Sequence, residues 1–148
     1  GGQSASTATV EIDAATATAS APIALTDMLP GDTESTTIEL ENTGTVGVYY
    51  TVRIVEVVGG DADLADELEV TVAVGALSET RTLSEWQDGA LQVGTALAAS
   101  GTVDVTVSVE LPLGADDSLQ GLGAGFSVQF DAIQQRNVTA PTAGWIAD

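Results

Sequence analysis

The chain has 148 residues, a formal net charge of -19, and neither cysteine nor histidine, and 44% of its residues are apolar. This length and composition suit one compact domain with an ordinary core. Three arginines cannot neutralise a run of phosphates, so the charge excludes nucleic-acid binding and disfavours an anionic membrane surface. The missing cysteine and histidine exclude disulfides, thiol nucleophiles, Ser-His-Asp triads and thiolate or HExxH zinc sites. No apolar run is long enough to span a membrane.

The N-terminal segment is predicted to be separate from the rest, with a leader and strand over residues 1–14 and a single β-sandwich domain over 15–148. Small polar residues come first, and apolar and polar residues then alternate as in a strand with one buried face. The apolar face of this strand consists of Ala8, Val10, Ile12 and Ala14. The chain opens on two glycines and not on methionine, as expected after signal-peptide removal or from an engineered start.

Period-two alternation recurs along the chain and predicts strands. It is clearest over 102–111, where four valines and Leu111 share one face. Residues 46–58 alternate until their phase changes near Val55, which indicates a β-bulge or a strand buried on both faces. Further alternating runs cover 36–41, 67–74 and 126–132. Turn residues separate these runs, so the sequence predicts an all-β, jelly-roll-like β-sandwich of about 7–9 mainly antiparallel strands.

Helical signals are confined to one or two short turns in the connections. Residues 84–89 are predicted to form one turn, with Ser84 as its N-cap and Gly89 at its end. Residues 63–68 are a second candidate.

The candidate chemical motifs favour structural over catalytic explanations. Asp61, Asp63, Asp66 and Glu67 form an acidic cluster, but an EF-hand counted from Asp61 would need glycine at Asp66 and glutamate at Val72. Charge runs of this kind usually lie on solvated faces. The glycine-rich segment 121–125 has no following lysine and precedes a strand, unlike a phosphate-binding loop. We therefore predict no catalytic residue, no bound cofactor and no metal ligand, and hence no enzyme. Asn137-Val138-Thr139 matches the N-glycosylation sequon.

Three segments in order resemble a known family. The first reads Met-Leu-Pro-Gly-Asp and is followed, after a strand, by Glu-Asn-Thr-Gly-Thr over 41–45. The second is the acidic stretch 117–121, and the third is FSVQFDAIQQ over 126–135. Together they resemble the TasA and camelysin family of secreted biofilm-fibre subunits. The matching positions are Pro30, Gly31, Asp32, Asn42, Gly44, Gln120, Gly121, Phe126, Phe130 and Gln134.

The resemblance implies a jelly-roll-like sandwich that is secreted to the extracellular space or cell surface after signal-peptide removal. It also implies a homopolymer, in which the N-terminal strand of one subunit completes the sheet of its neighbour. The expected role is thus a structural subunit of an extracellular filament, such as a biofilm-matrix fibre, with the subunit itself as partner. Subunits of charge -19 repel one another, so divalent cations and other matrix components are expected to assist assembly.

Two alternatives stay open from the residues alone. The N-terminal strand could pair within its own sandwich instead of with a neighbour. The chain could equally be a monomeric cell-surface module that binds carbohydrate or protein, for which Tyr49, Tyr50, Trp86 and Trp145 are the candidate aromatic contacts. A carboxylate-based hydrolase has the least support.

Overall fold

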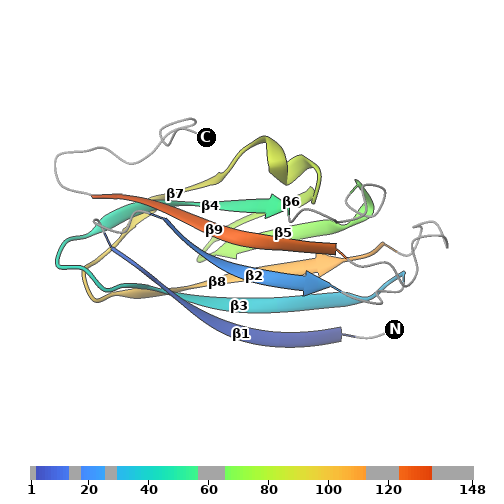
Figure 1. The fold of residues 1–148 in the computed structure, drawn as a ribbon, viewed down its shortest axis with the longest axis horizontal. Helices are drawn as coiled ribbons and strands as arrows, with labels where there is room; N and C mark the ends of the chain where they lie inside the picture. The colour runs from blue at the N-terminus through green and yellow to red at the C-terminus, as the bar shows by residue number, and fades with distance from the viewer. Residues whose placement is uncertain (1–2, 14–17, 26–29, 57–65, 113–123, 135–148) are drawn as a thin grey trace.

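The protein is a two-layered β-sandwich, seen in a computed structural model that describes residues 3–13, 18–25, 30–56, 66–112 and 124–134 (Figure 1). Its strands run along the long axis of the molecule. They are β1 (Gln3–Ile12), β2 (Thr18–Leu25), β3 (Thr33–Asn42), β4 (Val48–Glu56), β5 (Glu69–Val74), β6 (Leu77–Thr82), β7 (Leu91–Leu97), β8 (Thr102–Glu110) and β9 (Ala124–Gln134). A 3-10 turn, η1 (Glu85–Asp88), joins β6 to β7.

The strand order is that of a jelly roll with one strand added. One sheet has the order β1-β3-β8-β5-β6 and the other β2-β9-β4-β7. Strands β2 to β9 thus divide into two sets of four, as in a double-sheet jelly roll. These strands pair antiparallel, whereas β1 lies parallel to β3 at the edge of the first sheet. The predicted all-β sandwich of mainly antiparallel strands is therefore confirmed.

The core lies between the two sheets and follows the predicted alternation. From the first sheet it contains Ile38, Leu40, Val70, Val72, Val105, Val107 and Val109. From the second sheet it contains Val52, Ile54, Phe126, Val128 and Phe130. Each of these larger side chains contributes roughly 1.5 to 3 kcal/mol by leaving water, which makes the period-two pattern the main determinant of the fold.

Strand β1 completes its own sheet. Val10 lies opposite Leu40 and Ile12 opposite Asn42, and both apolar side chains are buried in the core of the same chain. Of the alternatives that the sequence left open for this strand, the structure has the intramolecular one. The apolar face of β1 is therefore buried within its own chain.

The turn η1 is capped differently from the prediction. Thr82 Oγ1 accepts a hydrogen bond from Glu85 N at 3.1 Å, and Thr82 N donates to Glu85 Oε1 at 2.8 Å. This reciprocal pair has the hydrogen bonds of a capping box. Ser84 and Gly89 do stand at the N-cap and C-cap positions, as predicted, but the Ser84 side chain does not cap the turn. Ser84 makes no cap hydrogen bond and donates to Asp66 Oδ1 instead. Asp66 and Glu67 are helical, in agreement with the second predicted turn, whose earlier residues lie outside the described part.

The segment after Val46 has its irregularity in a different place from the prediction. β4 pairs with β9 without a register shift from Val48 to Glu56, and residues 57–58 lie outside the described ranges. The shift lies instead in the pairing of β4 with β7, near Tyr49. The central strand β4 is partly buried on its outer face as well, since Thr51, which points away from the core, is only 2% exposed.

Candidate protein-binding groove

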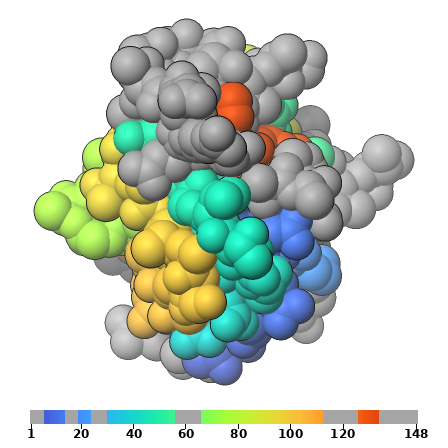
Figure 2. All heavy atoms as spheres, turned by 90° about the vertical axis from the view of Figure 1, so that its left-hand side faces the viewer, coloured from blue at the N-terminus to red at the C-terminus, as the bar shows by residue number. Residues whose placement is uncertain are grey.

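A surface groove of about 650 Å³ lies where the β5–β6 turn approaches β7 and the start of β8. Figure 2 looks onto this end of the sandwich, with the β5–β6 turn (lime green) projecting beside β7 and β8 (yellow to orange). Both sheets therefore contribute a wall. The lining residues are Tyr50, Val74, Gly75, Ala76, Leu77, Gln92, Val93, Gly94, Thr95, Ala96, Leu97, Thr102 and Val103.

One wall of the groove is a tight hairpin. Val74 pairs with Leu77, which leaves Gly75 and Ala76 as a two-residue turn. Gly75 has a φ of 58°, a conformation that glycine adopts without strain and that a type II′ hairpin needs at its first turn position. The turn places Leu77 beside the groove with 39% of its surface exposed. A leucine this exposed at the rim of a groove is a candidate contact for a partner.

The other wall is a bulged edge strand. Tyr50 pairs with Val93 and Val48 with Leu97, so Gly94, Thr95 and Ala96 of β7 face Tyr49 alone. Such a bulge takes backbone groups out of the ladder and bends the strand. Gly94 and Thr95 are exposed, and a Cβ placed on Gly94 would meet no atom within 4 Å. The backbone of β7 is therefore accessible from the groove.

The floor of the groove is apolar and neutral. Tyr50 is 2% exposed, and its burial raises the pKa of the phenol to about 12. The side chain is therefore uncharged at neutral pH. Val74, Val93 and Leu97 surround it as buried members of the core.

The charged groups of the sandwich lie outside the groove lining and are mostly negative. Arg53 Nε lies 3.6 Å from Asp131 Oδ2, and Arg81 pairs with Glu79 and lies over the Trp86 ring. Both described arginines are thus engaged within the protein. Carboxylates meanwhile oppose one another across the outer face of the first sheet, in the pairs Glu11–Glu41, Glu39–Asp104 and Glu69–Glu110.

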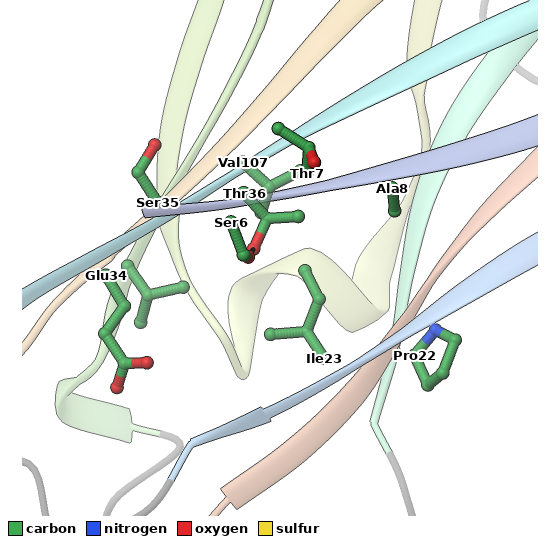
Figure 3. A pocket seen from close by; sticks show the side chains of 10 residues that line it. Ser6, Thr7, Ala8, Pro22, Ile23, Glu34, Ser35, Thr36 and Val107 are labelled. Carbon is green, nitrogen blue, oxygen red and sulfur yellow. Dashed lines mark hydrogen bonds between the residues drawn. The ribbon is translucent and has the colours of Figure 1, made fainter. Parts of the chain in front are cut away.

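A second, smaller cavity of about 200 Å³ lies at the opposite side of the sandwich (Figure 3). Strands β1, β2, β3 and β8 line it, with Ile23 facing Ser6 and Thr36 across the opening. The hydroxyls of Ser6 and Thr36 hydrogen-bond each other at 2.9 Å. Because Ala8 and its neighbours on β1 are small, they leave this space between the sheets unfilled. This cavity is small and its opening is polar, so it is the weaker candidate for a binding site.

Residues of the family motifs lie in turns and in the core. Gly31 has a φ of 91° and donates its N–H to Leu111 O, while Leu111 N donates to Asp32 O. Pro30 precedes Gly31 in the same turn. Phe126 and Phe130 are fully buried, and Gln134 ends β9. Ala14, Gln120, Gly121 and Asn137 lie outside the described residues.

Asn42 holds together the end of the sandwich beside the groove. Its Nδ2 donates to Val46 O at 2.8 Å and to Leu97 O at 3.1 Å, and its Oδ1 accepts from Gly44 N at 2.9 Å. A Cβ on Gly44 would lie 2.9 Å from Asp13 Cβ, so the backbones approach closely there. Asn42 thus ties the β3–β4 turn to Leu97 of β7.

Apart from Tyr50 on the groove floor, the aromatic and acidic candidates do not line the groove. Trp86 is fully buried and donates its Nε1–H to Val70 O at 2.8 Å, and Tyr49 is half-buried. Trp145, Asp61 and Asp63 lie outside the described ranges, and Asp66 and Glu67 are exposed. Within the described residues, no three histidine, cysteine or acidic side chains are placed to hold a metal ion. No helix there is long and apolar enough to cross a membrane.

Of the groove residues, the sequence indicated Tyr50 and no other. Gly75 and Gly94 were the available signals, since glycine directly after a valine-rich strand is typical of a tight turn and glycine within a strand is typical of a bulge. Neither signal shows that the two segments meet. Leu77 begins β6 in the first sheet, whereas β7 lies in the second sheet. The two segments meet only because each sheet first assembles from strands distant in the chain.

No protein-family model matches the chain, and no curated protein matches its sequence. Solved structures do match. PliG of Aeromonas hydrophila, a periplasmic inhibitor of g-type lysozyme, is 14% identical with a TM-score of 0.40, over 88% of this chain and 98% of that one. A mutant of Escherichia coli PliG is 10% identical, with a TM-score of 0.39 and coverage of 86% and 97%. PliG of Salmonella Typhimurium is 10% identical, with a TM-score of 0.39 and coverage of 85% and 96%.

These findings correct the predicted resemblance to TasA and camelysin. All three of these matching structures are lysozyme inhibitors, and none is a fibre subunit. The predictions that depended on this resemblance, a biofilm-filament function and a homopolymer with the subunit itself as partner, are therefore also wrong. The physical reason lies in β1, whose Val10 and Ile12 are buried against their own sandwich and are not offered to a neighbour.

Proposed function

We propose that this chain is a non-catalytic, secreted binding module that docks a basic protein in the groove between the β5–β6 turn and β7. The groove is the single observation that carries this proposal. Its volume of about 650 Å³ falls within the roughly 300–1,000 Å³ typical of ligand-binding clefts. Leu77 at its rim supplies an exposed apolar contact that continues the apolar floor of the groove.

The charge of the chain indicates the partner. A net charge of -19 repels anionic partners and speeds encounter with cationic ones. Arg53 and Arg81 are paired internally and offer no attraction to an anion. A protein segment that combines lysine or arginine with apolar residues therefore suits both the groove and its surroundings.

The alternative ligand class, carbohydrate, has less support. Sugar sites present exposed aromatic faces, whereas Tyr50 and Trp86 are buried and Tyr49 is half-buried. Catalysis also has little support at this site. The groove lining that the structure describes holds no carboxylate and no cationic side chain, so it lacks an acid–base pair.

Selection from a random peptide library tests the proposal without assuming which protein is the partner. Phage-displayed peptides are panned against the immobilised protein and, in parallel, against the Leu77→Asp variant. We expect enriched peptides to be basic with apolar residues, and to bind the original protein but not the variant. Because Leu77→Asp adds negative charge, a loss of binding by a basic peptide cannot come from weaker electrostatics.

Ile133→Asp is the matched control. Ile133 is 37% exposed, lies on β9 and does not line the groove, so this change adds the same charge elsewhere. Selected peptides should bind Ile133→Asp as tightly as the original protein. Failure to enrich any peptide, or peptides that bind all three proteins alike, would contradict the proposal. G-type lysozyme, the target named for the three matching structures, is a defined protein to add to this panel.

A further inference from the structure

The backbone of β7 is the feature of the groove that most restricts its occupant. β7 is the terminal strand of its sheet, and within the described residues no strand pairs with its outer side. It contributes the six consecutive residues from Gln92 to Leu97 to the groove lining. An unpaired strand edge presents a row of N–H and C=O groups that can pair with another chain.

A glycine keeps this edge clear of side chains. Gly94, Thr95 and Ala96 together face only Tyr49, so the ladder bonds that the bulge removes point toward β4, while the outer side of β7 is unpaired among the described strands. Gly94 has no side chain to obstruct the approach, and the space around its Cβ position is empty. A second backbone can therefore come within hydrogen-bonding distance of β7 here.

The opposite wall matches the side chains of an extended segment. Side chains on a strand alternate between two faces, so one face of an added strand would point at the groove and the other at solvent. Leu77, Ala76 and Val93 provide apolar contacts for the inward face. Lysine or arginine on the outward face would remain hydrated while being attracted by the acidic chain.

We propose, building on the function proposed above, that the partner binds as an extended basic segment that adds a strand to the outer edge of β7. Main-chain hydrogen bonds to β7 hold the segment, and every second side chain is apolar and enters the groove beside Leu77. This is strand addition to an exposed sheet edge, in which the main chain provides affinity and alternate side chains provide specificity.

Backbone methylation of a synthetic peptide tests this mode while leaving the protein unchanged. The probe is a short peptide in which lysine alternates with leucine, and its binding is measured by calorimetry at moderate salt. Single N-methyl groups are placed along it in turn, each removing one N–H donor. Strand addition predicts a period-two pattern, in which methylation at alternate positions weakens binding about tenfold or more and methylation between them has little effect.

A peptide of the same composition, with its lysines and leucines in separate blocks, is the sequence control. It should bind at least about tenfold more weakly than the alternating peptide, as should the alternating peptide to Leu77→Asp. If methylation has no periodic effect, or if the block peptide binds equally, while Leu77→Asp still abolishes binding, strand addition is overturned and the groove keeps its proposed function. If neither peptide binds, and library selection also fails, both proposals are overturned.

Discussion

Glu39 on β3 lies directly opposite Asp104 on β8, so two carboxylates face each other across neighbouring strands on the outer face of the first sheet. Like charges placed directly opposite each other destabilise a sheet. The pairs Glu11–Glu41 and Glu69–Glu110 repeat the arrangement on the same face. The fold therefore carries an electrostatic cost that the apolar core has to offset.

Replacing one member of a like-charged pair should stabilise the protein. For Glu39→Lys we expect the free energy of unfolding at low salt to rise by about 0.2–1 kcal/mol, because repulsion becomes attraction. Urea denaturation at low and high salt measures this. The original protein should gain stability with salt more than the variant does, since salt screens the repulsion. Equal salt dependence of the two proteins would contradict the explanation.

Burial of the Tyr50 phenol should make stability fall at high pH. Its pKa is about 12 in the folded protein and 10.0 unperturbed, so the folded state holds the proton more tightly. The stabilising contribution is complete below pH 10 and is lost as pH rises from about 10 through 12. Denaturation across this range should show a steeper decline for the original protein than for Tyr50→Phe. Identical declines would contradict the assignment.

Loss of Asn42 should loosen the end of the sandwich next to the groove. Asn42→Ala removes three hydrogen bonds and leaves carbonyls of Val46 and Leu97 without this donor, one of the bonds being buried. We expect a loss of at least about 2 kcal/mol in the free energy of unfolding, measured by urea denaturation, since an unsatisfied buried polar group costs roughly 1–3 kcal/mol. Thr45→Ala, at an exposed position in the same turn, is the control and should cost under about 0.5 kcal/mol.

Trp86 should act as a structural anchor of η1. Trp86→Phe keeps an aromatic ring but removes the donor to Val70 O, so we expect a loss of about 1–3 kcal/mol in the free energy of unfolding. Stacking of Arg81 over the ring, at 4.2 Å from its centre, adds to the effect. Tyr49→Phe, at a half-buried position on β4, is the control. Equal stability of Trp86→Phe and the original protein would contradict an anchoring role.

The sequence predicted central strands better than edge strands. Residues 102–111 were recognisable because one face is apolar and buried while the other is polar. Three strands that the alternation did not indicate, β2, β6 and β7, all lie at sheet edges. β2 contains Pro22, which an edge strand tolerates, and β6 consists of polar residues after Leu77, with no buried apolar face.

The groove was not predictable for a related reason. The bulge in β7 disrupts the alternation from Val93 to Leu97. The sequence pattern therefore predicts neither the strand β7 nor the groove beside it. β1 pairs in parallel with β3 because the outer side of β3 is free to accept a further strand. The alternating pattern of β1 suits intramolecular and intermolecular pairing equally well, so the sequence of β1 alone does not predict its partner. The partner of β1 and the position of the groove therefore depend on pairings between segments distant in the chain, which local sequence patterns do not determine.

Mapping the binding surface by NMR is the most direct test of the groove as a docking site. The isotopically labelled protein is titrated with a basic peptide selected from the library, and backbone amide shifts are followed. We expect shifts concentrated at Leu77 and from Val93 to Leu97, which disappear in Leu77→Asp and persist in Ile133→Asp. Shifts confined to the acidic outer face around Glu39 and Asp104, with the groove unaffected, would contradict this expectation.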